Sequence, residues 1–202
     1  NVTNIGAFAF ASCEGLKSVL IPDSVTSVGD YAFSGCYRLE FVKLPDSLTS
    51  VSKGVFRMCV ALESCVLPSG VTNIGDDAFY CCSKLTSVSI PDGVSSIGNY
   101  SFFGCEGLAD AEGFVIIKDI LFDYYGTDEM VVIPEGVRRI GNSAFGGSGM
   151  LREVCIPSCV TEIGNEAFRD CSNLQEVKTR SSQMQIGDYS FYNCPSLMRM
   201  CI

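Results

Sequence analysis

Apolar and polar residues follow a fixed order along this chain, which residues 85–105 show in full. Residues 85–91 carry apolar side chains at the first, fourth and sixth positions, and the last two alternate as the inward side chains of a strand do. Proline ends the strand because it cannot donate a hydrogen bond to a neighbouring strand. A second extended step directs Val94 and Ile97 inward, and Gly98 is expected to supply a positive φ or a close turn. The Asn that follows suits the N-cap of a short helical turn that carries Phe102.

This order returns at a fixed interval. Phenylalanine recurs at a spacing of 23 residues in two runs, which one gap of 43 residues separates. One hexapeptide pattern surrounds the phenylalanines in eight copies, and proline keeps the same spacing. The two runs are Phe10, Phe33, Phe56, Phe79 and Phe102, and then Phe145, Phe168 and Phe191. Since chance does not repeat a hexapeptide so often, the chain consists of internal sequence repeats.

The repeat predicts the fold. A unit of 23 residues with one strand, one turn and one short helix lies within the length range of leucine-rich repeats. One coil cannot bury its apolar face alone, but coils stacked about 4.8 Å apart bury a continuous core. We therefore predict a right-handed leucine-rich-repeat solenoid, with one parallel β-sheet and short helical turns on the opposite side. Residues 1–202 are expected to form a single solenoid of about eight coils, with an irregular coil over residues 108–134.

Two coils depart from the pattern elsewhere. Ser52 stands where glycine is expected, and Gly54 is expected to re-form the turn two residues later. In the coil that begins at Leu174, Gln183 replaces an apolar residue, and Met184 is expected to fill its place in the core.

The irregular coil predicts a β-hairpin insertion near residues 113–125, because residues 113–117 and 120–125 form two short apolar segments. Lys118 and Asp119 form the expected turn, although two-residue hairpin turns favour a glycine, which is missing here. The aromatic residues gathered at this place are Phe114, Phe122, Tyr124 and Tyr125. One interpretation is that they cover the sheet where the coil is irregular. The other is an aromatic ligand site, since irregular insertions in solenoids often lie on the binding face.

The repeat unit reads Leu-x-x-Val-x-Ile-Pro-x-x-Val-x-x-Ile-Gly-x-x-Ala-Phe-x-x-Cys and resembles the BspA-like class of leucine-rich repeats. Residues 16–36, 85–105 and 151–171 match this unit nearly position for position, and the likeness covers almost the whole chain. The hairpin resembles a variant known in that class. Members of the class are largely surface or secreted proteins that are often linked to adhesion or host-protein binding. The resemblance therefore implies a cell-surface or secreted location and a binding function.

Composition argues against several other classes of function. The chain carries 14 Lys and Arg against 23 Asp and Glu, a net charge of −9, so nucleic acid is not an expected partner. It contains no histidine, which excludes the Ser-His-Asp and Cys-His catalytic arrangements. No apolar run approaches the length of about 20 residues that spans a bilayer, so we expect no direct membrane insertion. We expect no enzyme activity, no cofactor and no metal site.

Cysteine is frequent, with 12 residues in the chain. Seven of them occupy one repeat position: Cys13, Cys36, Cys59, Cys82, Cys105, Cys171 and Cys194. Equivalent positions in adjacent coils lie about 4.8 Å apart with parallel Cβ vectors, whereas a disulfide needs Cβ atoms about 3.8 Å apart and turned toward each other. These cysteines are therefore expected to be free, buried thiols.

The outward face of the sheet is the expected ligand surface, because packing consumes the inward side chains. At one end this face carries Leu20, Phe41, Lys43 and Val66, and folding does not require such apolar side chains there. The other end is charged. Ligand contact is expected to centre near Phe41, with Phe122, Tyr124 and Tyr125 of the hairpin as the second choice.

These observations favour a non-catalytic extracellular adhesion or binding module for a protein or glycan ligand, such as a host or extracellular-matrix component. Two alternatives stay open: a structural spacer repeat of a surface protein, and an intracellular protein-interaction scaffold. Neither end of the chain carries a polar capping unit, so the chain is expected to be a fragment of a longer protein.

Overall fold

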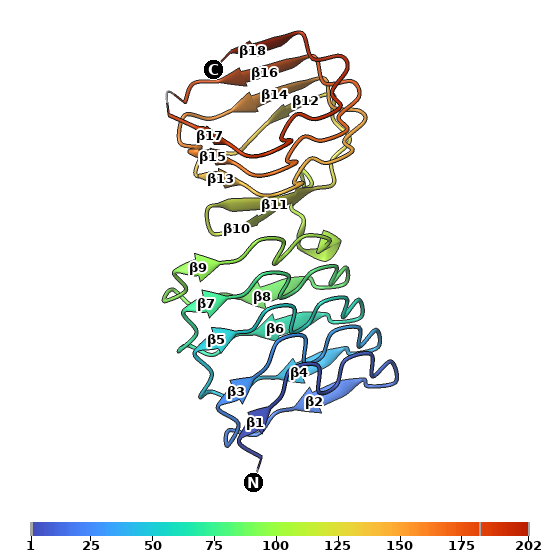
Figure 1. Ribbon diagram of the computed structural model, residues 1–202, viewed down its shortest axis with the longest axis vertical. Coiled ribbons are helices and arrows are strands. Elements are labelled where there is room, and N and C mark those ends of the chain that lie inside the picture. Colours follow the sequence, from blue (N-terminus) through green and yellow to red (C-terminus); the bar gives the residue numbers. More distant parts are fainter. Residues whose placement is uncertain (1, 182, 202) are drawn as a thin grey trace. The chain divides into compact units, whose positions relative to one another are not determined.

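The structure is a computed structural model that describes residues 2–181 and 183–201. The chain divides into two compact units, residues 1–108 (unit 1) and residues 109–202 (unit 2). Each unit is a stack of coils whose strands run parallel, apart from one antiparallel hairpin in unit 2 (Figure 1). That all 202 residues form one continuous solenoid stays a prediction.

Unit 1 contains three parallel sheets. Its principal sheet consists of β2 (Ser18–Leu20), β4 (Phe41–Lys43), β6 (Ser64–Val66) and β8 (Ser87–Ser89). The two-residue strands of the second extended step form the other two sheets. One contains β1 (Asn4–Ile5) and β3 (Ser27–Val28), and the other contains β5 (Ser50–Val51), β7 (Asn73–Ile74) and β9 (Ser96–Ile97).

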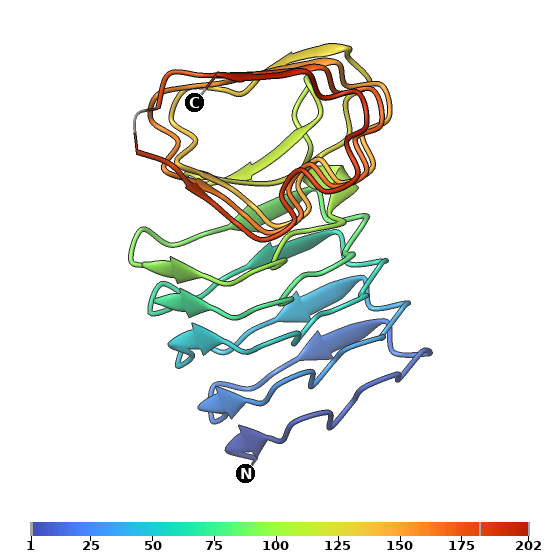
Figure 2. The same ribbon diagram turned by 45° about the horizontal axis from the view of Figure 1, so that its top comes forward.

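Unit 2 contains two sheets, and its stacked coils superimpose on one outline when they are seen nearly end-on (Figure 2). Its principal sheet consists of β12 (Met130–Val132), β14 (Glu153–Ile156), β16 (Glu176–Thr179) and β18 (Arg199–Cys201). The second sheet has the order β10 (Phe114–Ile117), β11 (Ile120–Tyr124), β13 (Arg139–Ile140), β15 (Glu162–Ile163) and β17 (Gln185–Ile186).

Strand register confirms the repeat. Ser18 pairs with Phe41, and Phe41 pairs with Ser64, so neighbouring strands are offset by one 23-residue unit. The phenylalanine of each coil stacks on that of the next, for example with 5.5 Å between the ring centroids of Phe56 and Phe79. The fully buried phenylalanines are Phe33, Phe56, Phe79, Phe102, Phe145 and Phe168. The predicted parallel solenoid core is therefore present in each unit.

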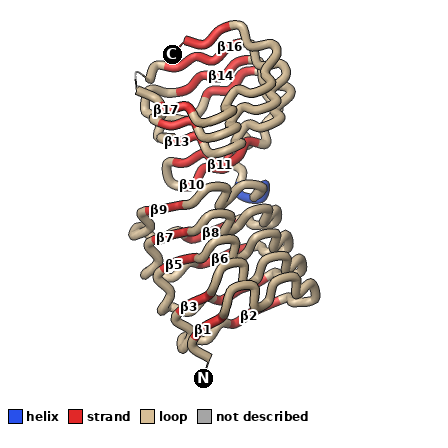
Figure 3. Tube along the Cα trace, viewed as in Figure 1, coloured by secondary structure: helices blue, strands red, loops and turns tan. Residues whose placement is uncertain are grey.

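The turns opposite the sheet differ from the prediction of short helices (Figure 3). Within residues 2–181 and 183–201, the only helix is the 3₁₀ turn η1 (Glu106–Leu108). Along the turns, backbone N–H groups alternate between two acceptors: Ala32 N–H donates to Gly29 O inside its own turn, whereas Phe33 N–H donates to Val55 O of the next coil. A helix would bond all these groups internally, so the bonds between coils replace it.

This alternation requires a left-handed backbone at two places in each coil. Two residues before the phenylalanine φ is 56–59°, and two residues after it φ is 56–77°. The residues at the first place are Phe8, Tyr31, Gly54, Asp77, Tyr100, Ser143, Glu166 and Tyr189. Most are not glycine, and each such residue costs about 1–2 kcal/mol, which the bonds between coils must offset.

Gly98 is required for a different reason from the expected positive φ. It is not among the glycines with positive φ, but a Cβ atom there would lie 2.4 Å from the backbone nitrogen of Asp76 in the preceding coil. The residue after it also serves the stack, because Asn99 N–H donates to the Asp76 carboxylate at 2.8 Å. Asp and Asn at this position therefore bridge coils and do not cap helices.

Of the two departures from the pattern, only the one at Met184 follows the prediction. Ser52 Oγ donates a hydrogen bond to Val28 O of the preceding coil, whereas the φ of 57° at Gly54 lies in the range found at this position throughout the repeat and marks no re-formed turn. Met184 packs against the core cluster of unit 2.

The cysteine column consists of free thiols, as expected. Except at Cys13, which is exposed, each S–H donates to the carbonyl oxygen of the phenylalanine in the preceding coil: Cys59 Sγ lies 3.2 Å from Phe33 O, and Cys171 Sγ lies 3.1 Å from Phe145 O. Burial raises the pKa of the Cys171 thiol to about 12, so it stays protonated and can donate. The thiols thus contribute hydrogen bonds as well as apolar packing.

The hairpin is confirmed, with β10 and β11 antiparallel and a bulge between Val115 and Ile116. Lys118, in the predicted turn, has φ of 57° and so takes the left-handed conformation that a glycine would favour. β11 pairs with β10 on one side and with β13 on the other, so it lies inside the sheet.

Candidate functional site

The principal sheet of unit 1 alternates buried and exposed side chains along every strand, which leaves one face open. In β4, Val42 is buried while Phe41 and Lys43 are exposed. The exposed positions of the four strands are Ser18, Leu20, Phe41, Lys43, Ser64, Val66, Ser87 and Ser89. We call these eight residues the unit 1 face.

Three large apolar side chains stand together on this face. Leu20 is 71% exposed, Val66 is 72% exposed and Phe41 is 48% exposed. Leu20 pairs in register with Lys43, and Phe41 pairs with Ser64, so the three lie on three successive strands. The sequence prediction thus placed Leu20, Phe41, Lys43 and Val66 on one surface, and the structure brings them together there.

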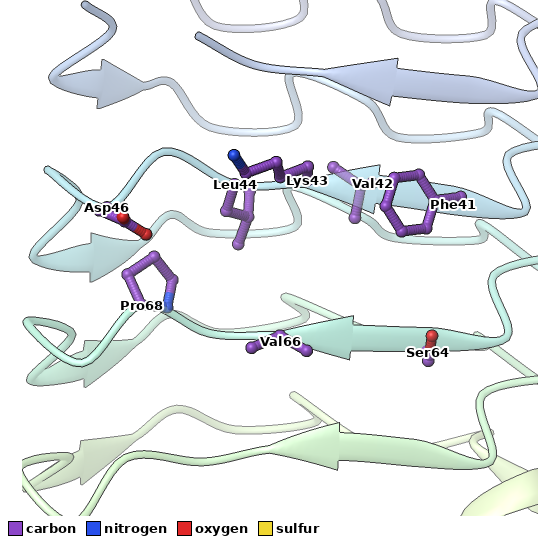
Figure 4. Close-up of a pocket in the computed structure, with 8 residues that line it drawn as sticks. All are labelled: Phe41, Val42, Lys43, Leu44, Asp46, Ser64, Val66 and Pro68. Atoms are coloured by element: carbon purple, nitrogen blue, oxygen red, sulfur yellow. The ribbon is translucent and has the colours of Figure 1, made fainter. Parts of the chain in front are cut away.

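A hollow of about 230 Å³ lies between β4 and β6 on this face. Figure 4 shows Phe41 and Ser64 at one end of it and Asp46 at the other. The hollow is lined by Phe41, Val42, Lys43, Leu44, Asp46, Ser64, Val66 and Pro68. Sites for drug-sized ligands are usually about 300–1,000 Å³, so this hollow suits a single side chain better than a whole small molecule.

The second predicted site, the hairpin aromatic group, is corrected in part. Phe122 is only 2% exposed and Tyr124 only 8%, so neither offers a surface to a ligand. Tyr124 continues the stack of aromatic rings, 5.0 Å from Phe145, where the irregular coil lacks its phenylalanine. Only Tyr125 is exposed, and its hydroxyl donates to the Asp123 carboxylate at 2.8 Å. For Phe122 and Tyr124, the interpretation that these aromatics cover the sheet is the correct one.

The principal sheet of unit 2 presents a charged face, as its sequence indicates. Lys178 contacts the carboxylates of Glu153, on the preceding strand, and of Glu176, on its own strand. The hydrogen bond from Lys178 lowers the pKa of Glu153. Arg152 and Glu129 form a further ion pair at 3.4 Å. These charges are therefore largely matched within the protein.

Sequence reasoning missed several residues at both faces. Leu44 and Pro68 line the hollow from positions assigned to the core and the turn. Met130 is exposed on β12, where the irregular coil hides its register. The register of the next strand could have found it, because Met130 pairs with Glu153.

Other site classes find no support in the described part of the chain. Within residues 2–181 and 183–201, no three His, Cys, Asp or Glu residues are grouped so that they could hold a metal ion. The same residues include no helix whose length and apolar character would let it cross a bilayer.

Comparison with known proteins identifies the repeat. A family model described as a BspA type leucine rich repeat region, in 6 copies, matches residues 1–109 and 115–202. No curated protein matches the chain.

Solved structures with similar folds are bacterial leucine-rich repeat proteins. The protein from Bacteroides ovatus ATCC 8483 is 25% identical with a TM-score of 0.58, and the match covers 98% of this chain but 57% of that one. The T. pallidum leucine rich repeat protein is 26% identical with a TM-score of 0.53, over 98% of this chain and 72% of that one. A leucine rich cell surface protein from Faecalibacterium prausnitzii A2-165 is 26% identical with a TM-score of 0.52, over 97% and 69%.

Proposed function

The chain belongs to the BspA-type leucine-rich-repeat family, and from this premise we propose that it is a non-catalytic module that binds a protein or glycan ligand through the unit 1 face. Leucine-rich-repeat solenoids are typically non-catalytic. They present a long, rigid row of side chains. Folding does not restrict which residues occupy the outward positions of this row.

The observation that carries this proposal is the apolar group on the unit 1 face. Leu20, Phe41 and Val66 are exposed on consecutive strands, although an open sheet face is more stable in water with polar side chains. Beside them lies a hollow that takes one side chain. Aromatic anchors beside pockets dominate most binding interfaces.

We place the module at the cell surface or in a secreted protein. The support is the family, together with the similar Faecalibacterium prausnitzii protein, which is described as a cell surface protein. The net charge of −9 favours a neutral or basic partner over a polyanionic one, since like charges repel as the two surfaces approach. Nucleic acid is therefore not a proposed partner.

The test is a binding screen of the folded protein against extracellular-matrix proteins and an array of glycans. Phe41→Ser should weaken binding at least tenfold, as expected for truncation of an anchor worth about 2 kcal/mol. Ser87→Ala, on the same face but away from the apolar group, should leave affinity within twofold of the parent protein, about 0.4 kcal/mol.

Two outcomes would contradict the proposal. Binding that is unchanged by Phe41→Ser and by Val66→Ser, in variants with parental melting curves, would place the site elsewhere. The absence of any ligand in the screen would favour the spacer alternative.

A further inference from the structure

Lys43 is the basic residue that lies beside the apolar group of the unit 1 face. It is the one charged residue of the unit 1 face, and no ion pair or hydrogen bond to its ammonium group is present among residues 2–181 and 183–201. Asp46 lines the same hollow but lies beyond 4.0 Å from it.

Unit 2 contains a lysine in the equivalent position that does form ion pairs. Lys178 occupies the same position in its strand as Lys43 does in β4. Its ammonium group is held by two carboxylates, Glu153 at the offset position of the preceding strand and Glu176 two residues earlier on its own strand.

The same two positions around Lys43 carry no charge. Ser18 on β2 corresponds to Glu153, and Phe41 on β4 corresponds to Glu176, as the shared strand register shows. The backbone geometry that brings two carboxylates to Lys178 is thus repeated around Lys43 without the carboxylates. A carboxylate from outside the protein can take the place beside Lys43 and Ser18 that the Glu153 carboxylate takes beside Lys178 in unit 2.

We propose that Lys43 receives a carboxylate of the bound partner, and that this partner is a protein segment in which Asp or Glu stands beside a large apolar residue. This inference rests on the proposed function and specifies the ligand of the same site. The apolar side chain enters the hollow between Phe41, Val66 and Pro68, and the carboxylate pairs with Lys43.

The lining of the hollow favours a peptide over an acidic glycan. Its walls are mainly apolar, and Ser64, Lys43 and Asp46 supply its polar side chains. Most edges of a sugar ring carry hydroxyl groups, and a buried hydroxyl without a partner costs free energy. The net charge of −9 further favours one carboxylate in an otherwise neutral or basic segment over a polyanion.

The probe is a displayed library of random linear peptides, selected on the folded full chain and then remade as soluble peptides for fluorescence polarisation. We expect the recovered peptides to carry Asp or Glu within two residues of Leu, Ile, Phe or Tyr. Changing that acid to its amide should weaken binding about three- to fivefold, as for loss of an exposed ion pair. In Lys43→Met the acid and amide peptides should bind equally, whereas Lys43→Arg should keep their difference.

A second variant supplies the missing carboxylate from the chain itself. Ser18→Glu should pair with Lys43 as Glu153 pairs with Lys178, and should weaken the acidic peptide about three- to fivefold. Ser87→Glu is the matched control, because it adds the same charge to the same face but two strands away from Lys43. It should weaken binding of the acidic peptide less. Lys178→Met should leave the affinity for the acidic peptide unchanged.

The outcomes separate the two proposals. One outcome is that binding depends on Phe41, but the Lys43→Met protein still binds the acid peptide more tightly than the amide peptide. This would overturn the role of Lys43 and leave the proposed function standing. Peptides without acidic residues, or a screen in which only glycans bind, would overturn the acidic-peptide partner. Recovered peptides that are insensitive to Phe41→Ser would contradict the proposed site as well.

Discussion

At the scale of single residues, the distance between coils decides which side chains are allowed. In most coils the glycine of the hexapeptide lies so close to the backbone of the preceding coil that a Cβ atom there would overlap it, as at Gly98 against Asp76. The phenylalanine lies inside the stack and touches the same residue of both neighbours, as Phe79 does with Phe56 and Phe102. The first position therefore favours glycine, with Ser52 as the exception, and the second requires a large side chain.

Gly98→Ala should lower the free energy of unfolding by more than about 1 kcal/mol, because the added methyl group would lie 2.4 Å from Asp76 N. Gly93→Ala is the matched control in the same coil. Its Cβ would meet only Val71 O, at an ordinary 3.8 Å, and it should change stability by less than about 0.5 kcal/mol. Urea melts of the two variants give the comparison. Equal stabilities would mean that the coils can separate at no cost.

Phe79→Ala should lower the free energy of unfolding by about 3–5 kcal/mol, through lost burial and the cavity left between two rings. Phe41→Ala, which removes the same ring from an exposed site, should cost less than about 1 kcal/mol. Both values come from denaturant unfolding followed by circular dichroism. A small effect at Phe79 would contradict the continuous aromatic stack.

At the scale of elements, the turn opposite the sheet is shaped by its neighbour in the stack. Alternate N–H groups donate to the next coil, which forces left-handed residues such as Tyr31 and Met58 and prevents a helix. Sequence reasoning assigned helices here because Asp and Asn before a turn are usual N-caps. The cysteine column belongs to the same element, since every thiol of the column except Cys13 donates to a carbonyl one coil away.

The buried thiols should make stability depend on alkaline pH. Burial raises the pKa of Cys65 to about 12, whereas the thiol in the unfolded chain titrates near 9, so above pH 9 the unfolded chain holds fewer protons and stability falls as pH rises. From pH 7.5 to pH 10.5 this single group should cost about 2 kcal/mol.

Cys65→Val isolates this contribution. The paired residue of the next coil is Val88, so valine fits this position. Urea melts at both pH values should show a smaller loss of stability for the variant than for the parent protein. Identical losses would mean that Cys65 does not hold its proton in the folded protein.

At the scale of the whole molecule, the chain consists of two units, within each of which the strands pair with those of adjacent coils, except β10, which pairs with β11 of its own hairpin. In such a stack, stability is close to a sum of coil terms and nearest-neighbour terms. A defect should therefore spread only to the nearest coils. This makes each unit a rigid local support for a binding surface such as the unit 1 face.

Amide hydrogen exchange of Phe79→Ala tests this locality. Within unit 1, protection should fall most in β7 and β9, and least in β1 and β3. Phe41→Ala should leave the protection of all these strands near the parent values. A uniform loss across unit 1 would instead show that the unit opens as one cooperative body.

The sequence by itself determined the repeat, the strand register, the phenylalanine stack, the free cysteine column and the hairpin, because each follows from residue spacing or from one 23-residue period. It also placed Leu20, Phe41, Lys43 and Val66 on one face, since alternate residues of a strand point the same way. Tertiary structure decided the rest. Contacts between coils turned the expected helices into alternating turns and made Gly98 a point of close approach. They also buried Phe122 and Tyr124 and left Lys43 unmatched. These features depend on which atoms of another coil lie opposite a residue, and a period along the chain does not specify that.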